Sequence, residues 1–139
     1  APPFIIDETH VEERVGGKLV INQPAGHLEP DESLVDAAIR ETLEETGWTV
    51  QLTAFVGAYQ WKAETGRHYL RFAFAGEPVC HDPGRDLDDG IVRALWLSPA
   101  ELQEAGARHR SPLVWRTASD FLAGRRFPLS MLNQLPDAP

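Results

Sequence analysis

Alternation of hydrophobic and polar residues with a period of two marks several short stretches of the chain. Residues 68–75 alternate in this way, which predicts a strand with two unlike faces: Tyr69, Arg71 and Ala73 on one, and Leu70, Phe72 and Phe74 on the other. Aromatic and branched residues predict further strands at Trp48–Tyr59, Phe4–Ile6, Lys18–Asn22 and Ile91–Leu97. The polar stretch Asp7–Glu13 separates two of these strands, and the acidic stretch Pro78–Gly90 reads as a loop before the last.

Helix start and stop signals divide the rest of the chain. Ser33 is a predicted N-cap, the stretch Leu34–Thr46 contains no Gly or Pro, and Gly47 stands where a helix would end. The preceding segment, Ala25–Asp31, reads as a loop because it holds Gly26 and Pro30. Two more helices are predicted to start at the Ser-Pro pairs Ser98-Pro99 and Ser111-Pro112, the second of them ending near Gly124.

Strands and helices mix without a regular βαβ alternation, so the expected fold class is α+β in a single domain spanning residues 1–139. No apolar run approaches membrane-spanning length, and Cys80 is the single cysteine, which excludes an internal disulfide and suits the cytoplasm. A net charge of −8 disfavours non-specific binding to nucleic acid. A small phosphate ester can still bind to an anionic protein through a divalent cation.

Glu41, Glu44 and Glu45 lie three and four residues apart, so they share one side of the first predicted helix. Their charges repel one another, and their place near the helix C-terminus opposes the helix dipole. Read alone, such a cluster is more often a solvated surface than a site. A bound Mg²⁺ would resolve the conflict, because this ion prefers carboxylate oxygens and shares its coordination with phosphates.

The residues around this cluster decide between the two readings. They follow the order G-x5-E-x7-R-E-U-x-E-E-x-G-U, in which U is a bulky apolar residue: Gly26, Glu32, Arg40, Glu41, Thr42, Glu44, Glu45, Gly47 and Trp48. Only Thr42 is less apolar than usual. In this motif the chain resembles the Nudix hydrolases, which cleave phosphoanhydride bonds.

The resemblance implies an α/β/α sandwich around a mixed β-sheet, with the motif forming a loop, a helix and a loop. It also implies that Glu41, Glu44 and Glu45 bind Mg²⁺, or Mn²⁺ in its place, and that the carbonyl of Ala25 adds a further ligand. Arg40 would orient the glutamates and Glu32 would pin the loop. Gly26 and Gly47 would serve the backbone geometry.

The proton acceptor is left open by the sequence. Glu44 or Glu45 could take the proton of the attacking water, but some relatives use an acid from a later loop. The acids Asp86, Asp88 and Asp89 precede the last predicted strand, and Asp89 is the preferred candidate, with Asp88 second. The alternative is that these acids form only a solvated turn.

The resemblance extends to bacterial phosphatases of the family through short segments that follow in the same order: 22–29, 59–61, 69–72, 110–114 and 124–129. It implies release of orthophosphate from nucleoside tri- and diphosphates, from hydroxymethylpyrimidine diphosphate and from thiamine diphosphate. Relatives normally have a further strand before Phe4. Only Ala1–Pro3 remain here, and we expect that the given sequence omits this strand.

Candidate substrate contacts follow from side-chain chemistry. Tyr59 and Trp61 could stack on a base, although packing in the core is an equal alternative. The remaining candidates are Arg71 and Lys62 for phosphates and Gln60 and Asn22 for ring edges. By contrast, Trp96 and Trp115 are expected in the core, Arg110 and Arg125 at the surface or at helix ends, and His27 in a structural role.

Two alternatives to a phosphatase stay open. The first is a Nudix pyrophosphohydrolase acting on a nucleoside diphosphate linked to another group, such as ADP-ribose. The second, from a different class, is a non-catalytic Nudix-fold module that binds nucleotides, but such modules usually lose the glutamates that are present here. A monomer and a homodimer are both compatible with the sequence.

Overall fold

Six strands and three α-helices make up the computed structural model, which describes residues 4–5 and 9–136. The elements are β1 Phe4–Ile5, β2 Thr9–Val15, β3 Lys18–Asn22, α1 Leu34–Thr46, β4 Trp48–Lys62, β5 His68–His81, β6 Ile91–Trp96, α2 Pro99–Glu104 and α3 Leu113–Leu122, with short 3₁₀ turns at Gly106–Arg108 and Leu129–Met131. The predicted strand position at Ile6 and the segment Ala1–Pro3 lie outside the described residues.

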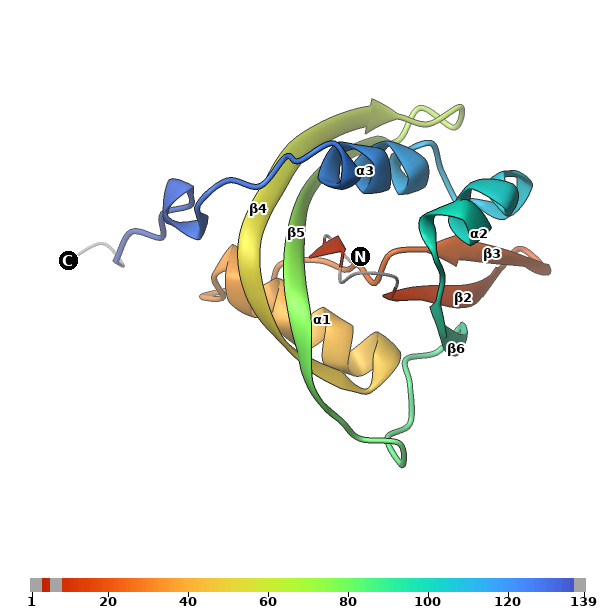
Figure 1. The fold of residues 1–139 in the computed structure, drawn as a ribbon, viewed down its shortest axis with the longest axis horizontal. Coiled ribbons are helices and arrows are strands. Elements are labelled where there is room, and N and C mark those ends of the chain that lie inside the picture. The colour runs from red at the N-terminus through yellow and green to blue at the C-terminus, as the bar shows by residue number, and fades with distance from the viewer. Residues whose placement is uncertain (1–3, 6–8, 137–139) are drawn as a thin grey trace.

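The strands form two three-stranded sheets, ordered β1-β5-β4 and β3-β2-β6. The short β1 runs parallel to β5, whereas β4 and β5 are antiparallel over almost their whole length, so the first sheet is mixed. Figure 1 shows β4 and β5 as a long curved pair, with α1 and α3 beside it and the second sheet across from it.

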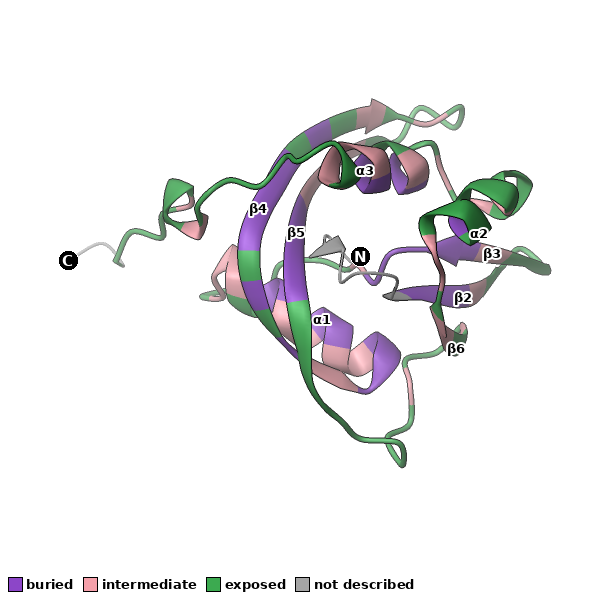
Figure 2. Ribbon diagram, viewed as in Figure 1, coloured by how far each residue is buried: buried purple, intermediate pink, exposed green. Residues whose placement is uncertain are grey.

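Helices cover the two faces of the β4–β5 pair. Ala38 of α1 packs on one face with Val50, Leu52, Phe55 and Phe74. Leu113 of α3 packs on the other with Ala54, Val56, Tyr59, Ala73 and Ala75. The buried positions therefore run along the middle of both strands and along one side of α1 (Figure 2). This arrangement confirms the α/β/α sandwich and the two unlike faces predicted for residues 68–75.

The caps predicted for α1 are present at both ends. The Ser33 side chain accepts a hydrogen bond from the Asp36 amide at 3.0 Å. At the other end, Gly47 has φ of 78° and its N–H donates to the Leu43 carbonyl. A Cβ on Gly47 would lie 2.9 Å from the Asp82 carbonyl oxygen, so both the backbone angle and the space require glycine. These caps fix where the helix presents its glutamates.

The structure corrects the prediction for Asp7–Glu13, because β2 occupies Thr9–Val15. The sequence of this strand is polar because its buried side chains include His10 and Glu12. Glu12 is 6% exposed and accepts hydrogen bonds from Arg93, at 3.2 Å, and from Arg108. A buried carboxylate paired with arginines replaces the apolar residue that a strand pattern normally shows.

Smaller corrections concern element ends and one tryptophan. β5 continues to His81, so the acidic loop begins later than Pro78, and α3 begins only at Leu113. Trp96 is 44% exposed instead of lying in the core, and it meets the Trp48 ring edge-on at 5.4 Å.

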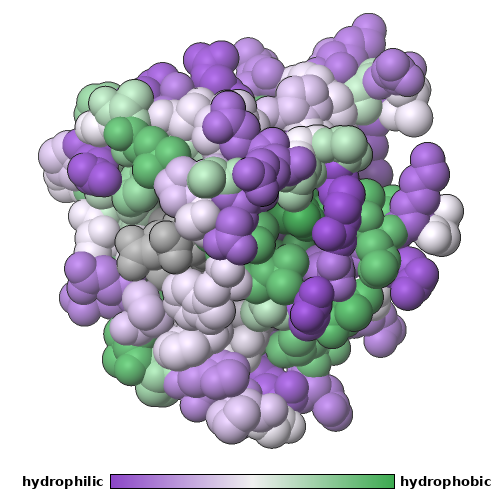
Figure 3. All heavy atoms as spheres, turned by 45° about the vertical axis from the view of Figure 1, so that its right-hand side comes forward, coloured by the Kyte–Doolittle hydropathy of each residue, from purple (hydrophilic) through white to green (hydrophobic). Residues whose placement is uncertain are grey.

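On the face drawn in Figure 3, hydrophobic side chains gather in a patch bordered by hydrophilic ones. Within the described residues, every helix is too short or too polar to cross a membrane.

Candidate active site

Arg40 stands at the centre of a hydrogen-bond network that joins α1 to the loop before it. Its Nε and Nη2 donate to the two carboxylate oxygens of Glu32 at 2.7 and 2.9 Å. Its Nη1 donates to Glu41 at 2.8 Å and to Glu44 at 2.7 Å, and Nη2 also donates to the His27 carbonyl at 3.0 Å. These partners raise the pKa of Arg40, and Arg40 in turn lowers the pKa of Glu32. These hydrogen bonds, called the Arg40 clamp below, join Glu32 of the loop to Glu41 and Glu44 of the helix, and the orienting role that the motif implies for Arg40 stays a prediction.

Three carboxylates from two segments converge beside this clamp. Glu41 and Glu45 of α1 and Asp88 of the loop before β6 each offer an oxygen atom, and these atoms lie within 4.8 Å of one another. The Asp88 amide donates to the Glu44 carbonyl at 3.0 Å, which holds the loop against the end of α1. Glu44 is not in this group, and its carboxylate is paired with Arg40 at 2.7 Å. The structure thus brings Asp88, and not the preferred Asp89, to the predicted cluster.

Burial makes this group unfavourable when it is fully charged. Glu41 and Glu45 are only 9% and 7% exposed. Burial raises the pKa of Glu45 to about 9, and it also raises the pKa of Glu41 against the opposing effect of Arg40. The pKa of Asp88 is raised by burial and then by the charge of Glu44. Since buried carboxylates without enough counter-charge are costly, the group is suited to accept a cation.

The loop before α1 closes around the same group. The Ala25 amide donates to Glu45 Oε1 at 3.4 Å. At Gly26, a Cβ would lie 2.0 Å from the Glu41 carboxylate carbon, so any larger residue there would displace the Glu41 carboxylate from its place in the group. An all-oxygen donor set, half enclosed by backbone, fits a hard divalent cation such as Mg²⁺ or Mn²⁺.

Replacing Arg40 by lysine tests the clamp. A single ammonium cannot reproduce the two-pronged contact with Glu32 and also reach Glu41 and Glu44. We expect Arg40→Lys to lower the free energy of unfolding by about 2 kcal/mol and the turnover rate by about 10²-fold. Urea unfolding and steady-state kinetics measure the two effects. As a control, Arg116→Lys changes an exposed arginine on α3 and is expected to leave both values nearly unchanged; an equally small effect of Arg40→Lys would contradict the role of the clamp.

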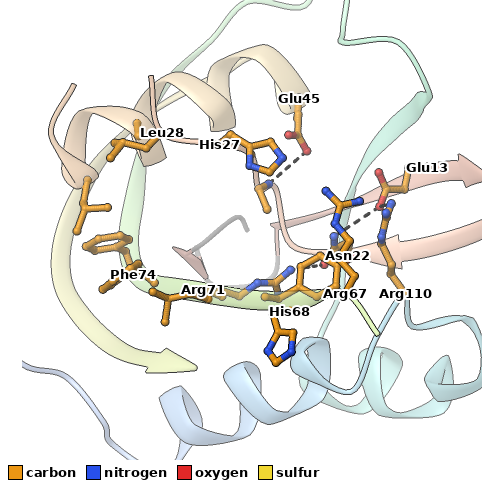
Figure 4. A pocket seen from close by; sticks show the side chains of 17 residues that line it. Glu13, Asn22, His27, Leu28, Glu45, Arg67, His68, Arg71, Phe74 and Arg110 are labelled. Carbon is orange, nitrogen blue, oxygen red and sulfur yellow. Dashed lines mark hydrogen bonds and ion pairs between the residues drawn. The ribbon is translucent and has the colours of Figure 1, made fainter. Parts of the chain in front are cut away.

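A cavity of about 570 Å³ opens beside Glu45. Basic side chains line one side, Glu45 and His27 lie across from them, and Leu28 and Phe74 close a third side (Figure 4). The lining comprises Glu13, Asn22, Ala25, Gly26, His27, Leu28, Leu34, Ala37, Glu45, Arg67, His68, Tyr69, Leu70, Arg71, Phe72, Phe74 and Arg110. Despite the acidic net charge, this cavity combines a basic wall with an apolar one, as an anionic organic ligand requires.

Of the predicted substrate contacts, Asn22 and Arg71 line the cavity and the four residues from β4 do not. Tyr59 is 9% exposed in the core beside α3, and its hydroxyl donates to Asp120 at 2.8 Å, so for this residue the structure favours the alternative of core packing over stacking on a base. Trp61 packs against the same core and stacks on Tyr69 at 5.5 Å. Gln60 and Lys62 are exposed on β4 outside the cavity.

Two residues that sequence reasoning had assigned elsewhere contribute to the cavity. Arg110 was expected to be a surface or helix-end residue, but it lines the cavity and pairs with Glu13 at 3.0 Å. His27, expected in a structural role, also lines it, while its carbonyl accepts from Arg40. Arg67 and His68 also line the cavity. Their isolated positions at a strand end carry no local signal, since the cavity is assembled by tertiary contacts.

Comparisons with known proteins show the family of the chain. A model of the NUDIX domain matches residues 10–116, so the chain belongs to the Nudix family. Phosphatase NudJ of Escherichia coli (strain K12) is 43% identical over 123 residues, which cover 88% of this chain and 80% of that protein. Phosphatase NudJ of Shigella flexneri has the same identity and coverage.

Solved structures extend the comparison. A NUDIX hydrolase from Nitrosomonas europaea has a TM-score of 0.91 and 45% identity, covering 95% of this chain and 93% of that one. The E. coli dihydroneopterin triphosphate pyrophosphohydrolase has a TM-score of 0.64 at 15% identity, covering 86% and 92%, and this likeness shows the fold alone. The chain is thus a Nudix hydrolase that cleaves phosphoanhydride bonds in small nucleotide-type substrates, and the non-catalytic alternative is set aside.

Proposed function

We propose that this Nudix hydrolase releases orthophosphate from nucleoside tri- and diphosphates and from the thiamine-pathway compounds hydroxymethylpyrimidine diphosphate and thiamine diphosphate, using Mg²⁺ or Mn²⁺. The observation that carries the proposal is the convergence of Glu41, Glu45 and Asp88 beside a cavity with a basic wall. The relatedness to phosphatase NudJ supports the choice of a phosphatase.

Glu41, Glu45 and Asp88 would hold the divalent ion, with the carbonyl of Ala25 as a further candidate ligand. When bound, the ion neutralises charge that develops on the phosphate and acidifies water. Glu44 supports the site indirectly, because Arg40 binds it and Glu41 together. Arg40 thereby keeps Glu41 directed at the cluster while a substrate binds and leaves.

Asp88 is the proton acceptor that the geometry favours. It is exposed to water, whereas Glu41 and Glu45 are buried, and it belongs to the cluster, whereas Asp89 does not. Arg71, with Arg67 and Arg110, would hold the phosphate chain, and the apolar wall around Phe74 would pack against the organic part of the substrate.

A substrate panel tests the proposal. The protein is incubated with Mg²⁺ and each candidate nucleotide or thiamine-pathway diphosphate, and orthophosphate and pyrophosphate are measured separately. We expect orthophosphate to form and chelation of the metal to stop the reaction. Pyrophosphate as the sole product would contradict the phosphatase and favour the pyrophosphohydrolase alternative, as would cleavage of ADP-ribose alone.

Metal affinity should depend on pH. Binding a divalent ion requires ionised carboxylates, and Glu45 releases its proton only near its raised pKa of about 9. We therefore expect the affinity for Mg²⁺ to rise with pH between neutral pH and about 9, by up to about tenfold for each pH unit. Calorimetry in buffers of different ionisation enthalpy measures both the affinity and the protons released. An affinity that does not change over this range would show that Glu45 is not a ligand.

A further inference from the structure

Gln23 is a fully buried polar residue that follows β3 and lies three positions before Gly26, the first residue of the Nudix motif. Its side-chain Nε2 donates to the Val114 carbonyl of α3 at 2.9 Å and lies 3.2 Å from His10 Nε2. Because a carbonyl can only accept, the amide nitrogen must face Val114, and this fixes the orientation of the whole amide. The other end, Oε1, is thereby directed toward Arg71 and accepts from its Nη1 at 3.2 Å.

Arg71 is held by amide oxygens alone. Its second terminal nitrogen, Nη2, donates to Asn22 Oδ1 at 3.3 Å, and the same oxygen accepts from the Gln23 backbone amide at 3.0 Å. Across the described residues, no carboxylate lies within ion-pair distance of Arg71, in contrast to Arg110, which is paired with Glu13. Arg71 therefore has no direct ion-pair partner among the described residues, and the carboxylates of Glu13 and Glu45 act on its charge only from a longer distance.

This charge lies on the wall of the cavity (Figure 4). The two hydrogen bonds use one hydrogen on each terminal nitrogen, so the guanidinium keeps further donors for a ligand. Burial and the nearby charge of Arg110 lower the pKa of Arg71 to about 10, which still leaves it protonated at neutral pH. A half-buried guanidinium that is hydrogen-bonded only to neutral acceptors favours an anionic ligand, and a phosphate matches its paired donors.

We propose that Gln23 is a positioning residue that orients Arg71 to bind a diphosphate group of the substrate. The inference rests on the proposed function, in which Arg71 is one of the phosphate contacts. Gln23 would act by supplying an uncharged acceptor at a fixed place. A carboxylate there would hold Arg71 equally well but would cancel its charge.

Binding of methylenediphosphonate, a hydrolysis-resistant diphosphate, tests this role. Calorimetry with Mg²⁺ compares the wild type with Gln23→Met, which keeps the shape but removes the acceptor, and with Gln23→Glu. We expect affinity to fall about tenfold in Gln23→Met and further in Gln23→Glu. KM for a turned-over substrate should rise by a similar factor, while kcat changes little.

The same substitution in an Arg71→Met background separates positioning from packing. If Gln23 acts through Arg71, Gln23→Met should add little to the loss that Arg71→Met already causes. If Gln23 only forms its hydrogen bonds with Val114 and His10, Gln23→Met should lower the affinity by the same factor in both backgrounds. That result would overturn the proposal. Thermal unfolding of each variant identifies any that fail to fold, and for such a variant the Gln23→Asn substitution replaces it, with a shorter amide expected to weaken binding in the same way.

The outcomes for the two proposals differ. Failure of the wild type to bind methylenediphosphonate, or unchanged affinity in both Gln23 variants, would overturn the positioning role. Absence of orthophosphate release by a wild type that binds the probe would instead contradict the proposed function and leave the binding comparison valid.

Discussion

Glu45→Gln is expected to lower the rate of Mg²⁺-dependent turnover by about 10²–10⁴-fold while making the metal-free protein more stable. The loss follows because Glu45 is the most enclosed carboxylate of the cluster with Glu41 and Asp88. The gain in stability of the metal-free protein follows because the same burial disfavours the charged form of Glu45. A neutral amide of the same shape removes that conflict and leaves the packing of α1 in place.

The sign of the stability effect can be worked out from the pKa of Glu45. Folding raises this pKa from 4.5 to about 9, so the folded state binds a proton more tightly than the unfolded state. The free energy of unfolding must therefore fall as pH rises through this interval. Glu45→Gln cannot titrate, and we expect it to exceed the wild type by about 1–3 kcal/mol at pH above about 8 in the presence of a chelator.

Chemical unfolding with and without Mg²⁺ measures these effects. The wild type should be stabilised by Mg²⁺, whereas Glu45→Gln should respond much less. Glu44→Gln is the matched control, since its carboxylate is paired with Arg40 at 2.7 Å, and its removal is expected to lower stability without metal. A Glu45→Gln protein that is less stable than the wild type in chelator at high pH would contradict the assignment of a charge conflict to this residue.

The elements whose signals are local could be predicted from the sequence. Helix α1 was placed from Leu34 to Thr46 because Ser33 and Gly47 act through hydrogen bonds to residues a few positions away. The spacing of Glu41 and Glu45 then puts both on one side of the helix, whatever the rest of the fold does. For this reason the half of the carboxylate cluster that lies on α1 was predictable.

Features that depend on tertiary pairing could not be predicted in the same way. β2 is stabilised by contacts of buried Glu12 with arginines far along the chain, so its own composition suggested a polar connection. In β4, register shifts near Leu52 and Phe55 change which face each later residue occupies. These irregularities leave no clear trace in the sequence, and they help explain why Tyr59 lies beside α3 instead of in the cavity.

The choice between Asp88 and Asp89 was also beyond the sequence. Adjacent residues of a loop point in different directions, and neither composition nor spacing shows which one faces a distant helix. The structure makes the choice through one backbone contact, the hydrogen bond from the Asp88 amide to the Glu44 carbonyl, which anchors the loop at the end of α1. With this anchor, the Asp88 carboxylate reaches Glu41 and Glu45.

Asp88→Asn is accordingly expected to lower kcat by about 10²–10³-fold, because it removes a carboxylate oxygen that can take a proton from water at the cluster. Asp89→Asn makes the same chemical change one residue further on, outside the cluster, and is expected to change kcat less than about threefold, as for a surface substitution. Neither substitution removes the backbone amide that contacts Glu44, so we expect the loop to keep its place in both variants. Steady-state kinetics over a range of Mg²⁺ concentrations separates a loss of metal affinity, which added Mg²⁺ restores, from a loss of the base, which it does not. A larger loss in Asp89→Asn than in Asp88→Asn would show that the loop rearranges when substrate binds and would return the role of proton acceptor to Asp89.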